Sequence, residues 1–408
     1  MTDMLTRSPS AWRVVIGTPL YRGATTALFF SGLGFSAAAP QIARFLVDDL
    51  GGSLTMAGLY YLTNLTALLA GFLVGRWSDR TGRRLGPFRI CAVAGFLGWL
   101  GIGLSTQLWM PFVISAVVLS FAGAATSQLF AAIHDELAAD HSSISDGVVS
   151  YVRMSLTFGW VIGPVAGSFL AGTLGLRPML VATAVCTLLQ ILPLGTLRDR
   201  ARRHREVFTP EAGTSSPEAR AGRPSVKPLL VFTGLYVLVY AGEPIKYAYL
   251  PIYMNDHHYA PGLSGAIIAI QPLVELVLMP VAAIVARKMG MLHLMVVGAL
   301  LGFGANMLFA LSGSPLGLFA AQLLMGGVWG VFAGLGIIVA QRLLPGAVAT
   351  ASAIFISAPA VSSALGGLVG GIGVAAAGLP LVFLAPSAMA LIASAGLVVL
   401  QRRLGTGI

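Results

Sequence analysis

Long apolar runs, separated by short polar or Gly- and Pro-containing breaks, dominate the chain. A helix needs about 20 apolar residues to cross the hydrocarbon core of a bilayer. The pattern predicts twelve such helices, near residues 20–46, 55–76, 88–106, 110–134, 148–173, 177–197, 228–254, 262–287, 291–312, 315–341, 346–374 and 379–401. We therefore expect an all-α membrane protein with twelve transmembrane helices.

The longest polar break, residues 198–227, divides the predicted helices into two groups of six. It is rich in charge, Pro, Gly and Ser, as flexible linkers are. We expect an N-terminal six-helix half over residues 1–197, a cytoplasmic linker over 198–227 and a C-terminal six-helix half over 228–408. Two such halves around a site at the membrane midplane are typical of secondary transporters.

The basic residues are distributed unevenly between the two sides of the predicted helices. With a cytoplasmic N-terminus, 21 of the 25 Lys and Arg residues fall on the cytoplasmic side. Only Arg44 and Arg177 fall outside, and Arg153 and Lys246 lie within predicted helices. Because cytoplasmic loops carry the excess of Lys and Arg, we expect a multi-pass protein of the cell inner membrane with both termini cytoplasmic.

Composition and motifs exclude several functions. The 408 residues are 56% hydrophobic and 10% charged, which leaves no room for a large soluble catalytic domain. The net charge of +10 is spread over short groups between apolar runs, which argues against nucleic-acid binding. Cys91 and Cys186 lie within apolar runs, so no disulfide or cysteine metal cluster is expected. Without a P-loop or hydrolase motif, we expect no enzyme activity, cofactor or metal.

The connection after the second predicted helix reads G-R-W-S-D-R-T-G-R-R over residues 75–84. It resembles the G-x-x-x-D-R-x-G-R-[RK] signature of the major facilitator superfamily, at the same position in the chain. The resemblance implies a conformational latch built from Gly75, Asp79, Arg80, Gly82 and Arg83. Physically, Gly75 permits close helix approach, and Asp79 and the arginines offer charge-assisted hydrogen bonds. The alternative is an ordinary basic turn.

The fifth predicted helix contains G-W-V-I-G-P-V-A-G over residues 159–167, similar to the G-x-x-x-G-P-x-x-G pattern of antiporters in that superfamily. Gly159, Gly163 and Gly167 form one face for close helix packing, and Pro164 weakens the helix for a bend. The resemblance implies export. Packing without directional meaning is the alternative.

Residues 151–164, Y-V-R-M-S-L-T-F-G-W-V-I-G-P, resemble the R-x-x-x-S-L-x-W-V-I-G-P-P stretch of the bacterial sugar efflux transporter family. An acid in the eighth predicted helix, Glu275, also resembles that family's pattern. The resemblance implies the efflux of sugars or glycosides.

Glu243 and Lys246 are three residues apart in the seventh predicted helix. Each ionised side chain costs about 2.5–3.5 kcal/mol at the centre of a membrane helix, so the two must pair or face a cavity. Tyr236, Tyr240 and Tyr247 continue the same helix face and could stack on sugar rings. We expect a substrate site here; the alternative is a structural ion pair.

Glu275 lies about midway along the eighth predicted helix, with no basic residue beside it in the sequence. Because desolvation favours the neutral carboxyl, Glu275 is predicted to exchange protons, with Glu243 at a comparable depth as a second proton-coupling acid. A permanently protonated Glu275, bonded to Gln271 one turn earlier, is the alternative.

Further candidates share polar or aromatic side chains within predicted helices. The predicted substrate-binding residues are Asn64, Gln128, Arg153, Trp160, Tyr240, Glu243, Lys246, Tyr247 and Gln271. Amides offer a donor and an acceptor to hydroxyls, and Gln41, Gln322 and Asn306 are further buried amides. For any single amide the alternative is an interhelical hydrogen bond, so the prediction concerns the set. Arg153 either faces a central cavity or reaches the cytoplasmic interface. Asp135 and its neighbours are expected in a solvated cytoplasmic loop.

These observations predict a monomeric proton antiporter that exports small polar solutes, with the substrate, protons and the lipid bilayer as partners. One proton supplies about 1.4 kcal/mol per pH unit and about 2.3 kcal/mol per 100 mV. A proton-coupled multidrug exporter is the alternative within the same class. A non-transporting membrane sensor is the alternative from another class, and a membrane-embedded enzyme comes third.

Overall fold

The computed structural model describes residues 11–139, 145–195, 197 and 225–404. Helices make up nearly all of this part of the chain, and it contains no strand. The prediction of an all-α protein is therefore confirmed. Most of the predicted linker, residues 198–224, lies outside the described residues.

Among the described residues, eleven helical segments are long and apolar enough to cross a membrane. They are Leu54–Thr81, Leu85–Gly103, Trp109–Leu137, Gly147–Thr173, Leu176–Leu194, Lys227–Asp256, Pro261–Met289, Met291–Leu311, Pro315–Leu343, Thr350–Ala377 and Leu381–Leu404. The 20-residue helix α2 (Pro19–Ala38) occupies the place of the first predicted span and is more polar, because it contains Arg22 and several Gly, Ser and Thr residues. With α2, the helices fill all twelve predicted positions.

The chain forms two compact units. Unit 1 comprises Met1–Ser53, Thr66–Asp199 and Met254–Pro272, and unit 2 comprises Leu54–Leu65, Arg200–Tyr253 and Leu273–Ile408. Each unit thus consists mainly of one half of the sequence and contains a short segment from the other half.

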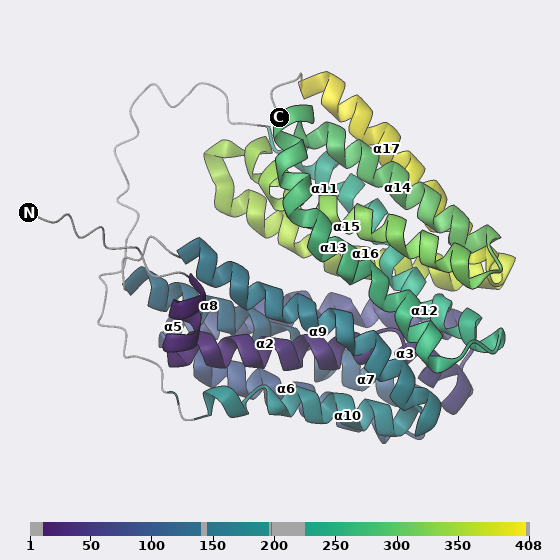
Figure 1. Cartoon of the computed structure of the whole chain (residues 1–408), viewed down its shortest axis with the longest axis horizontal. Coiled ribbons are helices and arrows are strands. Elements are labelled where there is room, and N and C mark those ends of the chain that lie inside the picture. Colours follow the sequence, from purple (N-terminus) through teal and green to yellow (C-terminus); the bar gives the residue numbers. More distant parts are fainter. Residues whose placement is uncertain (1–10, 140–144, 196, 198–224, 405–408) are drawn as a thin grey trace, which may run out of the picture. The chain divides into compact units, whose positions relative to one another are not determined.

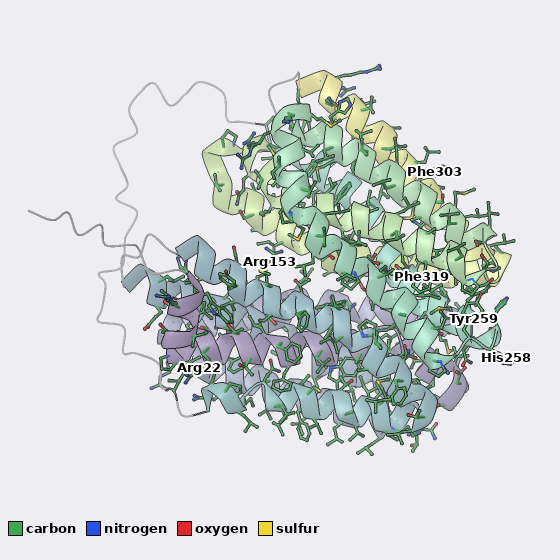
Figure 2. The ribbon with its side chains drawn as sticks, viewed as in Figure 1. Arg22, Arg153, His258, Tyr259, Phe303 and Phe319 are labelled. Carbon is green, nitrogen blue, oxygen red and sulfur yellow. The ribbon has the colours of Figure 1, made fainter. Side chains whose placement is uncertain are left out.

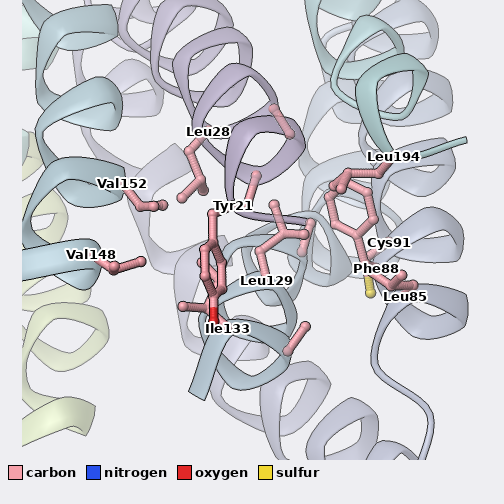
Figure 3. Packing of buried hydrophobic residues seen from close by; sticks show 14 of the residues in the cluster. Tyr21, Leu28, Leu85, Phe88, Cys91, Leu129, Ile133, Val148, Val152 and Leu194 are labelled. Carbon is pink, nitrogen blue, oxygen red and sulfur yellow. The ribbon is translucent and has the colours of Figure 1, made fainter. Parts of the chain in front are cut away.

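Unit 1 is a bundle in which α2 packs along α9 and α10, and α6 packs along α10 (Figure 1). Its helices are α1 (Ala11–Gly17), α2, α3 (Ile42–Arg44), the π-helix η1 (Phe45–Asp49), α5 (Thr66–Thr81), α6 (Leu85–Gly103), α7 (Trp109–Val117), η3 (Leu119–Phe121), α8 (Gly123–Ala139), α9 (Ser145–Thr173), α10 (Leu176–Leu189) and η4 (Leu192–Leu194). Tyr21, Leu28, Phe88, Leu129 and Val152 meet in its core (Figure 3). Close packing of this kind holds helices together in lipid.

Unit 2 is a second helical bundle, in which α14 packs against α15 and α17. Its helices are α4 (Leu54–Leu59), the 3₁₀-helix η2 (Tyr60–Leu65), α11 (Lys227–Tyr240), α12 (Gly242–Asp256, which runs into unit 1 after Tyr253), α14 (Met291–Leu311), α15 (Pro315–Leu343), η6 (Pro345–Ala347), α16 (Val348–Ala377), η7 (Leu381–Phe383) and α17 (Leu384–Leu404). Helix α13 (Pro261–Met289) begins in unit 1 and continues in unit 2.

The segment formed by α4 and η2 packs on α16, far away in sequence. A Cβ at Gly367 would lie 2.6 Å from the carbonyl oxygen of Gly58, and a Cβ at Gly371 would lie 3.0 Å from that of Thr55. These two glycines of α16 therefore let the backbones of the segment and the helix come into contact.

The seventh span is interrupted at Ala241, between α11 and α12. Pro244 explains the break, because a proline ring clashes with the carbonyl group four residues earlier, here that of Tyr240, where α11 ends. Proline is tolerated in the first turn of the next helix, where N–H groups have no helical partner. The break therefore places Glu243 in the first turn of α12.

Candidate functional site

A buried ion pair on α12 is the central polar feature of unit 2. Lys246 Nζ lies 2.9 Å from Glu243 Oε1 and 2.8 Å from Glu243 Oε2, so the ammonium donates to both carboxylate oxygens. The lysine and glutamate side chains are 1% and 8% exposed. The i, i+3 spacing on one helix brings the two side chains together.

Aromatic side chains from α11 and α15 surround the carboxylate. Trp329 Nε1 donates a hydrogen bond of 2.7 Å to Glu243 Oε1. Tyr240 packs edge-on against the Trp329 ring, with centroids 4.5 Å apart. The Tyr236 ring follows at 5.8 Å from that of Tyr240. The site therefore combines ionic groups with aromatic surface, which suits a polar ligand with apolar faces.

Glu275 and Tyr247 lie near the lysine of the pair. The Lys246 ammonium is 4.5 Å from the centroid of the Tyr247 ring, a cation–π contact. Glu275, on α13, is half-buried and within electrostatic range of Lys246 and Tyr240. Although no basic residue neighbours Glu275 in the sequence, the folded chain thus brings Lys246 within electrostatic range of it. Sequence spacing could not reveal this neighbour, because it lies on another helix.

Asn64 is also part of unit 2. Its Nδ2 donates to Ser363 Oγ of α16 at 2.7 Å. Its side chain is exposed, so the expected burial of this amide is wrong. Asn64 lies in η2, and a 3₁₀ stretch within a long helix often marks a hinge.

The other predicted substrate-binding residues, Gln128, Arg153, Trp160 and Gln271, belong to unit 1. Gln128 and Gln271 are buried, and the Trp160 ring packs against Phe35 with centroids 5.5 Å apart. Arg153 is exposed on α9 (Figure 2). The structure thus gathers Tyr240, Glu243, Lys246 and Tyr247 at one site in unit 2. Gln128, Arg153, Trp160 and Gln271 lie in unit 1 instead.

The predicted latch contains two ion pairs that share one arginine. Arg84 Nη1 lies 2.7 Å from Asp79 Oδ1, and Arg84 Nε lies 2.9 Å from Asp135 Oδ2. Arg84 also donates to Ser78 Oγ at 2.9 Å. Asp135 lies within helix α8, so the prediction of a loop there is wrong. The cluster ties the ends of α5 and α8 to the start of α6.

Arg84 stays charged at any physiological pH. Burial by itself lowers the pKa of its guanidinium, but the hydrogen bonds to Asp135 and Asp79 outweigh burial and raise the pKa above its ordinary value. The two carboxylates therefore always face a cation.

The remaining latch residues differ in their surroundings. Gly82 has a φ of 63°, a left-handed conformation that strongly favours glycine. Arg80 and Arg83 are exposed. A Cβ at Gly75 would meet no described atom within 4 Å, so the close helix approach expected there is absent from this structure.

The glycine face of α9 packs on α2. A Cβ at Gly159 would lie 2.6 Å from Leu33 N, one at Gly163 would lie 2.7 Å from Leu33 O, and one at Gly167 would lie 2.5 Å from Ala37 O. Pro164 lies within α9 beside this face. Larger residues at the three glycine positions would force the two helices apart.

Three features of these sites were missed by sequence reasoning, namely Trp329, the contact made by Asp135 and the pairing role of Arg84. A tryptophan in an apolar run looks like core, and no local spacing links Arg84 to an acid 51 residues away. Asp135 could have been found, because an acid near the end of an apolar helix indicates an ion pair with a nearby basic residue.

The family model of the Major Facilitator Superfamily matches residues 24–358 of the chain. A putative sugar efflux transporter of Deinococcus radiodurans is 27% identical over 375 residues, which are 91% of this chain and 95% of that protein. Sugar efflux transporter B of Salmonella typhimurium is 24% identical over 351 residues, 84% of this chain and 86% of that one. Multidrug resistance protein MdtG of Enterobacter lignolyticus is 28% identical over 269 residues, 62% of this chain and 60% of that one.

Solved transporter structures share the fold. The crystal structure of the nucleoside transporter NupG superposes with a TM-score of 0.76 at 17% sequence identity. The match covers 93% of this chain and 98% of that one. At this low sequence identity, the structural similarity shows only that the two proteins share a fold.

Proposed function

The chain belongs to the major facilitator superfamily, and from this premise we propose that it exports small polar solutes, sugars or glycosides, in exchange for protons. It is a multi-pass membrane transporter of a small molecule and not an enzyme. The finer statements, namely the sugar substrate, the proton coupling, the direction and a monomeric state, are the proposal.

The observation that carries the substrate class is the buried Glu243–Lys246 pair with Trp329 and Tyr240 around it. Indole and phenol rings stack on the apolar faces of sugar rings, and the polar groups beside them bind hydroxyls. Two relatives that align with most of the chain are named sugar efflux transporters, which supports the same class.

Proton coupling is assigned to Glu275, with Glu243 as the second acid. Glu243 already accepts from Lys246 and Trp329, so protonating it would disrupt these bonds. Glu275 is half-buried on α13 and within electrostatic range of Lys246, so a change in its charge would be felt by the ion pair of the candidate site. A pH gradient of one unit together with 100 mV would sustain export by about 500-fold for one proton per solute.

We place both termini in the cytoplasm. The distribution of basic residues supports this orientation, because 21 of the 25 Lys and Arg residues then fall on the cytoplasmic side. A reporter enzyme fused after residue 210 should be cytoplasmic, and one inserted near His257 should be external. Reversed accessibility at either point would contradict this orientation.

The function is tested by transport into everted membrane vesicles, in which export appears as uptake. We expect a labelled glucoside to accumulate when the vesicle interior is acidified, and to equilibrate only when the gradient is collapsed. Glu275→Gln should abolish accumulation and retain exchange of labelled for unlabelled sugar. Wild-type accumulation by Glu275→Gln would remove Glu275 from proton coupling.

A second candidate, multidrug export, is favoured by the similarity to proteins named MdtG. The same vesicles distinguish the two candidates when the uptake of a hydrophobic dye such as ethidium is measured instead of the uptake of the glucoside. Gradient-driven uptake of the dye without uptake of any sugar would establish this candidate and exclude the first.

A further inference from the structure

Gln322, on α15, is a fully buried amide, and neither of its polar atoms finds a partner among the described residues. Its side chain is 0% exposed, and neither Nε2 nor Oε1 forms a hydrogen bond within the described part of the chain. A glutamine amide can donate two hydrogen bonds and accept two. Buried polar groups are almost always satisfied, so Gln322 calls for a partner from outside the protein chain.

Two other buried glutamines form at least one hydrogen bond from the side-chain amide. Gln41 donates from Nε2 to Ser168 Oγ and accepts at Oε1 from Arg44. Gln190 donates from Nε2 to the carbonyl oxygen of Thr187. Within the described residues, Gln322 is the one amide whose nitrogen and oxygen are both enclosed and both unbonded. Gln128, Gln190 and Asn306 each leave only their amide oxygen buried and unbonded within the described residues, whereas Gln322 leaves both of its polar atoms so.

The position of Gln322 on α15 directs it to the candidate site. It precedes Trp329 by seven residues, which is nearly two helical turns, so both lie on the same face about 10 Å apart along the axis. Trp329 uses that face to reach Glu243 at 2.7 Å.

Two contacts between α12 and the chain at and before α15 show which part of α12 lies at the same level as Gln322. Just before α15 begins, a Cβ at Gly313 would lie 3.8 Å from Tyr253 Oη. Further along, Trp329 bonds to Glu243. The two helices therefore run antiparallel, and Gln322 falls level with the stretch of α12 that carries Lys246 and Tyr247.

In this site the charged groups are already bonded to one another, because Glu243 accepts from both Lys246 and Trp329. A ligand hydroxyl that met only these groups would have to displace an existing bond. Gln322 offers a donor and an acceptor with no bond to break. We propose that the Gln322 amide binds one hydroxyl of the transported sugar and makes the transporter specific for that hydroxyl. This inference rests on the proposed function.

Specificity toward single hydroxyl groups tests the proposal. Binding of methyl β-D-glucoside and of its 2-, 3-, 4- and 6-deoxy analogues should be measured with purified protein in nanodiscs. We expect wild type to prefer the parent sugar to one analogue by about tenfold or more. Gln322→Met keeps the side-chain volume and removes the amide. In this variant the ratio of the affinities for the parent sugar and that analogue should fall to about one. The matched variant Gln190→Met, at another buried glutamine, should retain the wild-type ratio.

Thermal unfolding of Gln322→Met should occur at the wild-type temperature or above, because an unpaired amide is removed. A lost preference in this variant would then not reflect misfolding. If Gln322→Met retains every hydroxyl preference of the wild type, the proposal is overturned.

A cysteine experiment tests the site without a sugar. In a background with Cys91→Ala and Cys186→Ala, Gln322→Cys should react with a hydrophilic methanethiosulfonate added to vesicles. Ala321→Cys, at a neighbour that is equally buried, should not react. An inert Gln322→Cys would overturn the proposal. A reactive one in a protein that binds no glucoside would refute the sugar function while leaving Gln322 in a site for another hydroxylated ligand.

Discussion

Two ion-pair clusters of this transporter both join a basic side chain to carboxylates, but they differ in how deeply they are buried. In unit 2, Lys246 and Glu243 are 1% and 8% exposed and share two hydrogen bonds. In unit 1, Arg84 is 13% exposed, but its partners Asp79 and Asp135 are 69% and 30% exposed. Removing Lys246 leaves the Glu243 carboxylate buried without its cation, whereas removing Asp79, which water largely solvates, leaves Arg84 paired with Asp135.

Distance alone therefore does not rank these contacts. The Asp79–Arg84 separation of 2.7 Å is shorter than either Glu243–Lys246 distance, yet we expect the longer contacts to matter more. Burial decides, because it sets the cost of losing one partner.

The largest effect is expected from Lys246→Met. It leaves Glu243 buried without its cation, which should destabilise the protein by about 3–5 kcal/mol. Thermal unfolding in detergent and the yield of inserted protein measure this loss. Adding Glu243→Gln should restore much of the stability. If transport also returns in the double variant, the pair is only structural; if affinity stays low, the pair binds substrate. Equal tolerance of both single changes would contradict an energetic coupling between the two residues.

An intermediate effect is expected from Trp329→Phe, which keeps an aromatic ring but removes the N–H donor to Glu243. Losing a hydrogen bond to a charged group should reduce the free energy of unfolding by about 1.5–3 kcal/mol. In a Glu243→Gln background the same change should cost less, because the acceptor is no longer charged. Unfolding of the four proteins gives this coupling, and additive losses would contradict it.

The smallest effect is expected from Asp79→Asn. Because the Asp79 side chain is mostly exposed, the lost contact should be worth about 0.2–1 kcal/mol, or a shift in conformational populations of at most about 5-fold. Labelling of engineered cysteines on the two membrane faces measures that shift, and high salt should reduce the difference from wild type. Asp135→Asn, at the less exposed partner, should have the larger effect. Labelling that is unchanged in both variants would leave the cluster with no role beyond anchoring the loop.

The helices and their family could be predicted from the sequence because the signals are local. A bilayer imposes a fixed length of apolar chain, and the motif at residues 75–84 is contiguous. The i, i+3 spacing of Glu243 and Lys246 likewise predicts an ion pair, which the structure contains. In each case the interacting groups lie within one turn or one loop.

Contacts between distant segments could not be predicted in the same way. Trp329 reaches Glu243 across 86 residues, and Asn64 reaches Ser363 across 299. In the sequence, Trp329 cannot be distinguished from a core residue, because its function lies in one N–H group and the direction in which it points. Nor does the hydropathy pattern show that residues 54–65 pack within the unit formed mainly by the second half of the chain.

The packing of α4 and η2 on α16 has a consequence for the order in which the protein is made. The segment leaves the ribosome about 300 residues before its docking surface on α16 does, which at about 5–20 residues per second is a delay of roughly 15–60 seconds. Throughout that interval its contact face must be covered by lipid, by the insertion machinery or by temporary protein contacts. Unit 2 cannot be completed before α16 has been synthesised, so a nascent chain that stops before α16 lacks the surface on which residues 54–65 pack.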